Sequence, residues 1–437
     1  MTVVNETPPR AETATAASKG PEVEFPTPRL GRSVRIVGPV ASVDPSDLPH
    51  PRAHRGELGK AVYNWRHSTI SPDPITRVAF ETLSADPNNT LNVRKAPMGT
   101  VNPERTPVSD PAAMSRHIKR VARTLGLDVV AVGRSHPSFM YAGRTNELTD
   151  MGDDELENPE TVVRKLPCYI VGSVAWDYRL SKAHRHHIGD AAYDLTGKKT
   201  RVIMAALQRY IQELGYHTLA GAMNGQAGAV AAGIGELGRN GLVITPKFGA
   251  RIHANDTIMT DLPLAPDGPI DIGVSDFCNA CNKCATTCPT NSITFGGKVV
   301  ENGVEKYKIN WLTCYKLRPF VVDHWANCLT CAVVCPYTKP TAWWHDAAIW
   351  ALQFTPPPVR PVVVQALKWL DDRIWGLAPR QRVRWLGYDS GIKPGERACT
   401  VSGCTAPHDE MSNLIPAGEV GYYAPLKENT NRFVKRG

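Results

Sequence analysis

The sequence predicts a mixed α/β (α+β) fold in which a cysteine-rich module follows a larger domain. Strand-like and helix-like patterns alternate over residues 61–270, which is typical of domains whose helices pack on a sheet. Eight of the eleven cysteines lie within residues 278–335. The chain of 437 residues, with 42% hydrophobic and 21% charged residues, can bury more than one core without disulfides or metals. The cysteines are therefore expected to carry chemistry rather than to hold the fold together.

Local patterns define the elements of the α/β domain. Ile118, Val121, Ala122 and Leu125 recur at helical spacing, and Gly126 suits the C-cap of that helix. A second helix is expected over 203–214, because its apolar residues share one face and a glycine follows. Short apolar runs predict buried strands at 129–132, 169–175 and 242–244.

Four regions are expected along the chain. Residues 1–60 are rich in Pro, Thr, Ala and Glu without a sustained apolar period, so they predict an extended or disordered N-terminal arm. The α/β domain at 61–270 and the cysteine module at 271–345 follow. Residues 346–437, with three consecutive prolines and several tryptophans, are expected to form a tail packed on the core.

Charge and hydropathy narrow the possible partners and location. The net charge is +8, but the 50 Lys and Arg residues are interleaved with 42 Asp and Glu residues, so a nucleic-acid partner is not favoured. The apolar stretches fall short of the roughly 18–20 residues of a membrane span. Residues 1–20 have neither a twin-arginine pair nor an apolar signal region, so the expected location is cytoplasmic.

The cysteines follow the spacing of iron–sulfur ligands. Residues 278–289 have the pattern C-x2-C-x2-C-x3-C-P of bacterial ferredoxins, and a second run at 328–336 follows Cys314 after thirteen residues. In such runs the cysteine before proline ligates the other cluster. The predicted ligands of one [4Fe–4S] cluster are Cys278, Cys281, Cys284 and Cys335. Those of the second cluster are Cys288, Cys314, Cys328 and Cys331.

Three other interpretations of these motifs are disfavoured. Structural zinc sites also use C-x2-C pairs, but zinc does not favour a third cysteine at this spacing or a Cys-Pro ending in both halves. Residues 233–238 match G-x-G-x-x-G, yet a helix-like segment precedes them and a strand follows, the reverse of a dinucleotide site. The histidines at 184–187 lack a carboxylate or cysteine partner at helical spacing, which favours a solvated loop.

The sequence resembles the cobalamin-dependent reductive dehalogenases between Ile118 and Asp346. The resemblance rests on both cysteine runs and on the segments 122–133, 214–216, 223–225, 244–249, 260–264 and 343–346. It implies base-off cobalamin held in the α/β domain. The residues expected at the cofactor are Asn224, Gly225, Phe248 and Gly249, where glycine lets the backbone approach a large flat ring. For Asn224 a turn asparagine is the alternative.

The resemblance also implies a reaction. Electrons pass through the two clusters to cobalamin, a halogen leaves an organohalide, and a tyrosine delivers the proton. A ferredoxin, a flavodoxin or a reductase is expected as the electron donor. Two other functions remain open: epoxyqueuosine reductases share the double cysteine run and act on tRNA, and a ferredoxin-type electron carrier needs no corrinoid.

The family's site pairs the tyrosine proton donor with a basic residue. Counted back from the Leu-Gly-Tyr at 214–216, the tyrosine position falls near Gly197, and Tyr193 lies four residues upstream as the candidate donor. A structural surface tyrosine is the alternative. The basic residue is expected to be Arg251 or His253, and a histidine would make its support depend on pH.

The loop between two ligands of the second cluster is expected to line the substrate pocket. Arg318 in this loop could clamp an anionic group on the substrate, such as a carboxylate or phenolate. A surface arginine is the alternative. The expected pocket residues are Tyr315, Arg318, His324 and Trp325.

Overall fold

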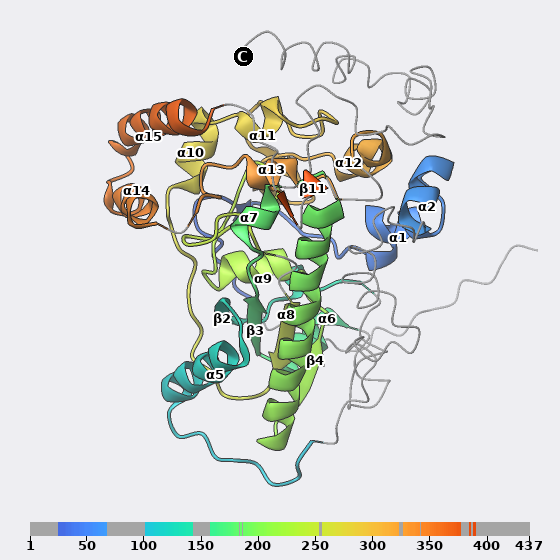
Figure 1. The fold of residues 1–437 in the computed structure, drawn as a ribbon. Coiled ribbons are helices and arrows are strands. Elements are labelled where there is room, and N and C mark those ends of the chain that lie inside the picture. Colours follow the sequence, from blue (N-terminus) through green and yellow to red (C-terminus); the bar gives the residue numbers. More distant parts are fainter. Residues whose placement is uncertain are drawn as a thin grey trace, which may run out of the picture.

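The computed structural model describes residues 25–67, 101–142, 158–182, 184–185, 187–252, 256–322, 327–340 and 342–376, together with the backbone of 384–385 and 388–389. Near its centre lies a four-stranded sheet in the order β2-β3-β7-β4 (Figure 1). All neighbouring strands are antiparallel. The mixed class of helix and sheet is confirmed. The strands are β2 (Val129–Arg134), β3 (Cys168–Ser173), β4 (Thr218–Ala220) and β7 (Asp256–Thr260).

Alternation along β3 divides the domain into two cores. Cys168 and Ile170 join the core that holds α5 (Pro111–Leu125) and α8 (His187–Glu213). Tyr169 and Val171 join the core on the other face. Successive side chains of a strand point to opposite faces, so the apolar residues of β3 contribute to the cores on both faces of the sheet. The second core is covered by α6 (Pro159–Lys165) and α9 (Gly225–Ala231).

The predicted helix that ends at Gly126 is confirmed as α5. Asp110 caps its start by accepting a hydrogen bond from the N–H of Ala112 at 2.8 Å, and Gly126 ends it with a φ of 113°. The second predicted helix is longer than expected, because α8 begins at His187. Its first half is largely polar and has no clear apolar period, so the sequence pattern indicated only the half that begins near Ile203.

The glycine-rich segment 233–238 follows α9 and includes the first strand of a small hairpin. This hairpin pairs β5 (Glu236–Leu237) with β6 (Val243–Ile244) in antiparallel register. A helix therefore precedes the segment and a strand follows it, as the sequence predicted. This order does not match the strand–loop–helix unit of a dinucleotide site.

The cysteine module consists of short helices around one hairpin, β8 (Val299–Glu301) and β9 (Val304–Lys306). The N-terminal segment packs against it, since β1 (Arg35–Ile36) pairs with β9. The helices of the module are α10 (Val274–Ala280), α11 (Lys283–Thr286), α12 (Trp311–Leu317), η6 (Arg318–Phe320) and α13 (Thr330–Val333).

Helix α1 (Pro49–His54) departs from the extended arm expected for residues 1–60, and α2 (Lys60–His67) begins at the end of that range. Ala53, Leu58 and Val62 are buried against Val321 and Val322 of the cysteine module. Packing against another element stabilises such short helices, and a sequence pattern of this length does not reveal that packing. Further short turns are η1 (Pro45–Asp47), η4 (Pro137–Phe139) and α7 (Tyr178–Ser181).

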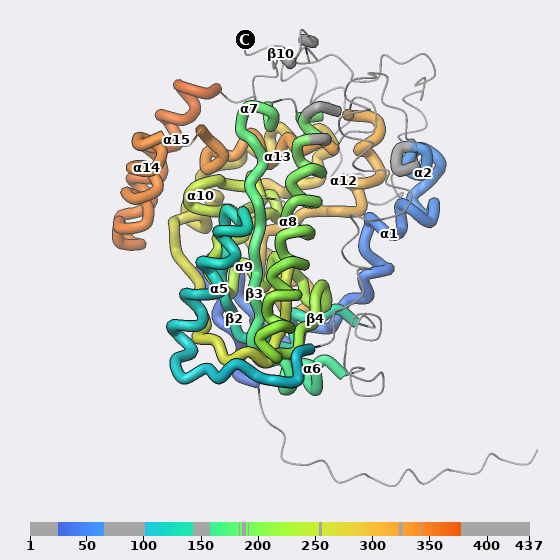
Figure 2. Tube along the Cα trace, turned by 60° about the horizontal axis from the view of Figure 1, so that its bottom comes forward, coloured from blue at the N-terminus to red at the C-terminus, as the bar shows by residue number. Residues whose placement is uncertain are grey.

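Two helices follow the module, α14 (Trp343–Phe354) and α15 (Arg360–Trp375). They pack on α10, where Ile349 and Val364 are buried with Phe277. Figures 1 and 2 place this pair at the opposite end of the molecule from α1 and α2. A two-stranded hairpin, β10 (Arg384–Trp385) with β11 (Tyr388–Asp389), lies beyond them in the sequence. No helix in the described ranges is long and apolar enough to cross a membrane.

Candidate active site

The structure brings Cys335 together with the first three cysteines of the ferredoxin run. Burial raises the pKa of the Cys335 thiol to about 12, and the charges of Cys278 and Cys281 add to the rise. Burial also raises the pKa of Cys284 well above its usual range, with further contributions from Cys278 and Cys335. Cys284 and Cys335 therefore both interact electrostatically with Cys278 and Cys281. This is the first of the two predicted ligand sets.

The second set forms around Cys288, the cysteine that precedes Pro289. Burial raises the pKa of Cys288 to about 11, and Cys314 and Cys328 raise it further. The pKa of Cys331 is raised by burial and by the same three cysteines. Cys335 thus interacts with the first three cysteines, and Cys288 with Cys314 and Cys328. This grouping agrees with the crossed ligand sets, which stay a prediction.

The chemistry of these donors fits iron–sulfur clusters. All described cysteines are free thiols, and an apolar environment makes a thiolate costly unless a metal binds it. Among the described residues, no group of three or more His, Cys, Asp or Glu side chains converges on a point where one metal ion would fit.

Arg239 supports the first ligand set and was not indicated by the sequence. Its side chain is 2% exposed and donates to the carbonyl of Cys278 from Nε at 3.1 Å and from Nη2 at 2.9 Å. Its backbone N–H donates to the Sγ of Cys278 at 3.4 Å. Hydrogen bonds to cluster sulfurs raise the reduction potential. No motif indicates this role, because the partners are carbonyl groups distant in sequence.

Arg318 links the second ligand set to the predicted proton donor. Its Nη2 donates to the Sγ of Cys314 at 3.4 Å, and its guanidinium lies 4.2 Å from the ring centroid of Tyr315. Burial raises the pKa of Tyr193, the charges of Asp194 and Tyr315 raise it further, and Arg318 opposes the rise. The structure therefore brings Tyr193, Tyr315 and Arg318 into one site.

A carboxylate that sequence reasoning missed completes this network. Nη1 of Arg318 donates to Oδ1 of Asn327 at 2.6 Å, and Nδ2 of Asn327 donates to Asp190. Burial raises the pKa of Asp190 to about 7, and the neighbouring Asp194 adds to the rise. Asp190 precedes Tyr193 by one turn on the polar half of α8. The only available signal was two aspartates on one helical face, which is ordinary for a solvated helix.

Arg251 lies among aromatic residues next to the Tyr193 site. Its guanidinium lies 5.5 Å from the ring centroid of Tyr178 and 5.7 Å from that of Phe248, and Nη1 donates to the carbonyl of Trp176. Trp176 packs in turn on Tyr193, with ring centroids 4.8 Å apart. Arg251 is thus connected to Tyr193 through Trp176, while the charge of Arg318 acts on the pKa of Tyr193. The other candidate, His253, lies outside the described residues.

Two polar atoms beside this site have no hydrogen-bond partner among the described residues. They are Nε1 of Trp176 and Nε of Arg251, both buried. A buried donor without a partner costs about 1–3 kcal/mol. A bound molecule with acceptor oxygens at this position would remove that cost, so these residues fit an amide- or phosphate-bearing cofactor.

The residues expected at the cofactor have local structural roles. Asn224 caps α9 by accepting from the N–H groups of Gln226 and Ala227, and Gly225 is the first residue of that helix. Gly249 has a φ of 56°, and a Cβ there would lie 2.3 Å from the carbonyl oxygen of Tyr337. The backbone contact with Tyr337 therefore accounts for this glycine. Two expected pocket residues, His324 and Trp325, lie outside the described residues.

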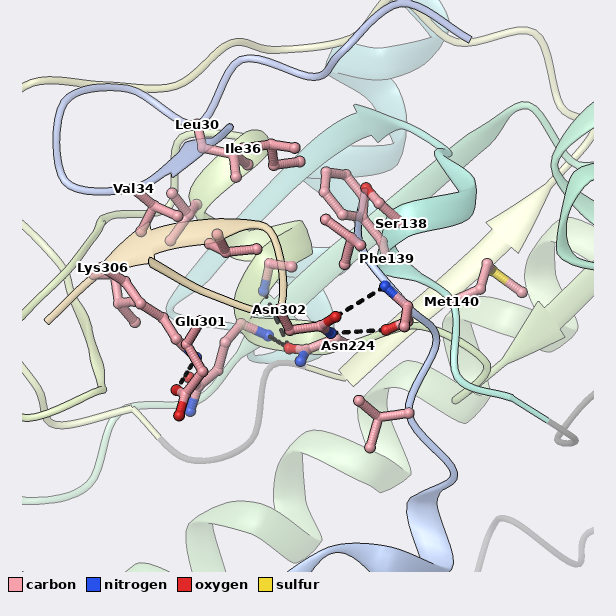
Figure 3. A pocket seen from close by; sticks show the side chains of 18 of the residues that line it. Leu30, Val34, Ile36, Ser138, Phe139, Met140, Asn224, Glu301, Asn302 and Lys306 are labelled. Carbon is pink, nitrogen blue, oxygen red and sulfur yellow. Dashed lines mark hydrogen bonds and ion pairs between the residues drawn. The ribbon is translucent and has the colours of Figure 1, made fainter. Parts of the chain in front are cut away.

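Asn224 also lines a cavity of about 230 Å³ (Figure 3). The cavity lies between the N-terminal segment, the start of α9 and the β8–β9 hairpin, where Asn302 exchanges two hydrogen bonds with the backbone of Ala41. Of the residues predicted for the site, the lining of this cavity contains Asn224 alone. Its volume is below the roughly 300–1,000 Å³ of drug-sized ligand pockets, so it does not accommodate a corrinoid by itself.

Two sets of four thiols, none of them in a disulfide, lie beside a tyrosine, an arginine and a carboxylate, and this donor set suits a two-cluster iron–sulfur protein. Residues 277–339 match the 4Fe-4S dicluster domain family. This segment is accordingly a domain for two [4Fe–4S] clusters.

The predicted resemblance to reductive dehalogenases is confirmed. The chain is 28% identical over 295 residues to the tetrachloroethene reductive dehalogenase of Sulfurospirillum multivorans, covering 60% of this chain and 57% of that protein. It is 36% identical over 177 residues to that of Dehalobacter restrictus, covering 39% of this chain and 29% of the relative. The matches thus span little more than half of these relatives, or less.

Solved structures show the same fold. A catabolic reductive dehalogenase in complex with 3-bromo-4-hydroxybenzoic acid is 21% identical with a TM-score of 0.64, and the match covers 81% of this chain and 49% of that chain. The expected second family also appears. The epoxyqueuosine reductase of Listeria monocytogenes is 36% identical over 125 residues, which is 27% of this chain and 31% of that protein.

Proposed function

We propose that the chain is a cobalamin-dependent reductive dehalogenase that replaces a halogen of an organohalide by hydrogen. Two electrons and one proton convert the carbon–halogen bond into a carbon–hydrogen bond and release halide. When bound, the corrinoid supplies the electrons to the carbon–halogen bond. The two clusters pass electrons to it from a ferredoxin, a flavodoxin or a reductase. Similarity to tetrachloroethene reductive dehalogenases supports the reaction class.

One observation carries the proposal. Arg318 bonds to Cys314, a proposed ligand of the second cluster, and its charge acts on Tyr193. The point where electrons leave the clusters therefore lies beside the phenol that would supply the proton. A protein that only carries electrons has no need of a buried phenol and carboxylate at this point.

The proposed proton donor is Tyr193. Its phenol would donate a proton as the carbon–halogen bond breaks, which leaves a phenolate in a buried site. A phenolate in such an environment is costly unless a cation stands nearby, and Arg318 supplies that positive charge. Asp190, whose pKa is raised to about 7 by burial, can hold the next proton within the same hydrogen-bonded network.

Cofactor content and halide release test this proposal together. Protein purified without oxygen should contain about eight iron atoms per chain, the content of two [4Fe–4S] clusters, and about one cobalt. With reduced methyl viologen it should release halide from tetrachloroethene or from a brominated phenol. If the protein contains iron but no cobalt and releases no halide from either compound, the dehalogenase proposal fails and the electron-carrier function is favoured.

Epoxyqueuosine reduction on tRNA is the second candidate. The similarity to an epoxyqueuosine reductase over 125 residues favours it. The same purified protein should be offered an epoxyqueuosine-modified tRNA stem loop. Conversion to queuosine without any halide release would replace the dehalogenase assignment.

A further inference from the structure

We propose that the outer face of α14 and α15 is the docking surface for the redox protein that donates electrons to the first cluster. This inference rests on the proposed function, because it requires electrons to enter from a separate carrier. The surface, called here the aromatic face, consists of Trp343, Trp350, Phe354, Val362 and Trp369.

The aromatic face exposes large apolar side chains to solvent. Trp343 is 81% exposed, Val362 is 71% exposed, and Trp350, Phe354 and Trp369 are each 63% exposed. More than half of the large apolar side chains that stand exposed in the described part of the chain lie on or beside these two helices. Contiguous exposed apolar groups mark an interaction site.

The inner side of the same helices packs on the ligands of the first cluster. Val364 of α15 and Ile349 of α14 are buried in one core with Cys281, and Cys278 and Cys335 pack against it. A helix is about 10 Å across. A partner seated on α15 would therefore be separated from the first cluster by about one helix diameter.

A buried ion cluster fixes α15 to the ligand loop. Lys283, which lies between Cys281 and Cys284 in the sequence, is buried and bonds to Asp371 and Asp372 of α15, the latter at 2.8 Å. Lys339 also pairs with Asp371, at 3.2 Å, so three ion pairs join α15 to the cysteine module and hold the aromatic face over the proposed first cluster. Such a surface is preorganised, so docking does not require it to reorder.

The second cluster faces a different part of the molecule. Cys328 packs against the core that Ala53, Leu58 and Val62 form with Val321 and Val322, so α1 and α2 cover that end, while α14 and α15 cover the other (Figure 2). The second cluster also lies beside Tyr193 through Arg318. Electrons bound for the Tyr193 site therefore enter most directly at the first cluster, under the aromatic face.

The charges favour an acidic redox protein as the occupant. The net charge of the chain is +8, which attracts acidic carriers over a distance. Exposed Arg373 lies 5.8 Å from the ring centroid of Trp369, and aromatic residues with arginine are enriched at protein interfaces. A membrane-binding helix would carry a strongly basic polar side, whereas Lys368 is paired with Asp372 at 2.9 Å.

The test compares a protein donor with a small one. The holoenzyme with Trp350→Glu and Trp369→Glu is mixed in a stopped-flow instrument with a reduced two-cluster ferredoxin, a reduced flavodoxin, or reduced methyl viologen. We expect the protein donor to reduce the clusters about 10-fold more slowly or worse than in the unaltered chain, the effect of losing an aromatic hot spot. The rate with methyl viologen should not change. Val202→Glu on α8, which is 42% exposed in the unaltered chain, is the matched control and should leave all rates unchanged.

Three outcomes would overturn the inference. The first is reduction of the double variant by the protein donors as fast as the unaltered chain. The second is that neither protein donor reduces the unaltered chain. The third is a double variant that keeps its donor rates but no longer forms a dimer in sedimentation or no longer binds phosphatidylglycerol vesicles. The last result would assign the face to a second copy or to lipid. The proposed function has a separate test, because methyl viologen needs no docking surface. If the protein releases no halide with methyl viologen, the proposed function fails whatever the result of the docking experiment.

Discussion

Nη2 of Arg318 donates a hydrogen bond to the Sγ of Cys314 at 3.4 Å. The same guanidinium opposes the rise in the pKa of Tyr193 that burial causes. One cation thus stabilises negative charge on a cluster ligand and on a phenol. An electron that arrives at the second cluster makes Cys314 a stronger competitor for the positive charge of Arg318. Less of that charge is then available to stabilise a phenolate at Tyr193, so reduction of the cluster favours the protonated phenol.

Replacing Arg318 by Gln should lower the reduction potential of the second cluster. A hydrogen bond to a charged group contributes about 1.5–3 kcal/mol, which corresponds to roughly 65–130 mV for a one-electron couple. Redox titration monitored by EPR gives the two potentials separately. Arg209→Gln, at an exposed position of α8, is the control. A shift in the first cluster alone would contradict the placement of Arg318 at Cys314.

Replacing Cys288 by Ser should damage the cluster of Cys314, Cys328 and Cys331. Cys314 and Cys328 raise the pKa of Cys288, and Cys288 raises that of Cys331, which supports this ligand set. EPR of the reduced variant should therefore retain the signal of the first cluster and lose or alter the second. Loss of the first signal with a normal second one would show that the ligands do not cross over.

Replacing Tyr193 by Phe should lower kcat for halide release by about 10²–10⁴-fold, the usual contribution of general-acid catalysis. Iron and cobalt content should stay unchanged, because the ring keeps its packing on Trp176. Tyr178→Phe is the matched control, since Tyr178 lies beside Arg251 instead of Arg318. If the control loses activity and Tyr193→Phe retains it, the proton donor is Tyr178.

The sequence predicted the parts of the fold that rest on local patterns. Helix α5, with its glycine cap, and strands β2, β3 and β6 follow from apolar spacing, whereas the short strands β4 and β7 of the central sheet were not predicted. The crossed cysteine sets are a prediction from spacing alone, because C-x3-C-P geometry is local. The start of α8 and helices α1 and α2 did not follow, because packing against distant residues stabilises them. Asp190 and Arg239 were missed for the same reason, since their partners, Asn327 and Cys278, are brought to them only by the fold.

The buried carboxyl of Asp190 should make both activity and stability depend on pH near 7. Burial raises its pKa to about 7, Asp194 adds to the rise, and Asn327 and Arg318 oppose it. In the unfolded chain the pKa of aspartate is about 3.9, so the folded state binds the proton more tightly. The stability from this group is full below pH about 3.9 and is lost as pH rises through about 7.

Asp190→Asn should therefore remove a pH dependence rather than simply reduce activity. In the unaltered chain, kcat for halide release should fall as pH rises through about 7, because the proton held at Asp190 is lost. The amide of the variant cannot titrate, so its lower kcat should vary little over this range, and its melting temperature relative to the unaltered chain should improve from pH 5 to pH 8. Asp110→Asn, at the exposed start of α5, is the control and should keep the original profile. A profile in Asp190→Asn that still bends near pH 7 would assign the titration to another group, and the proton held for Tyr193 would have to come from that group.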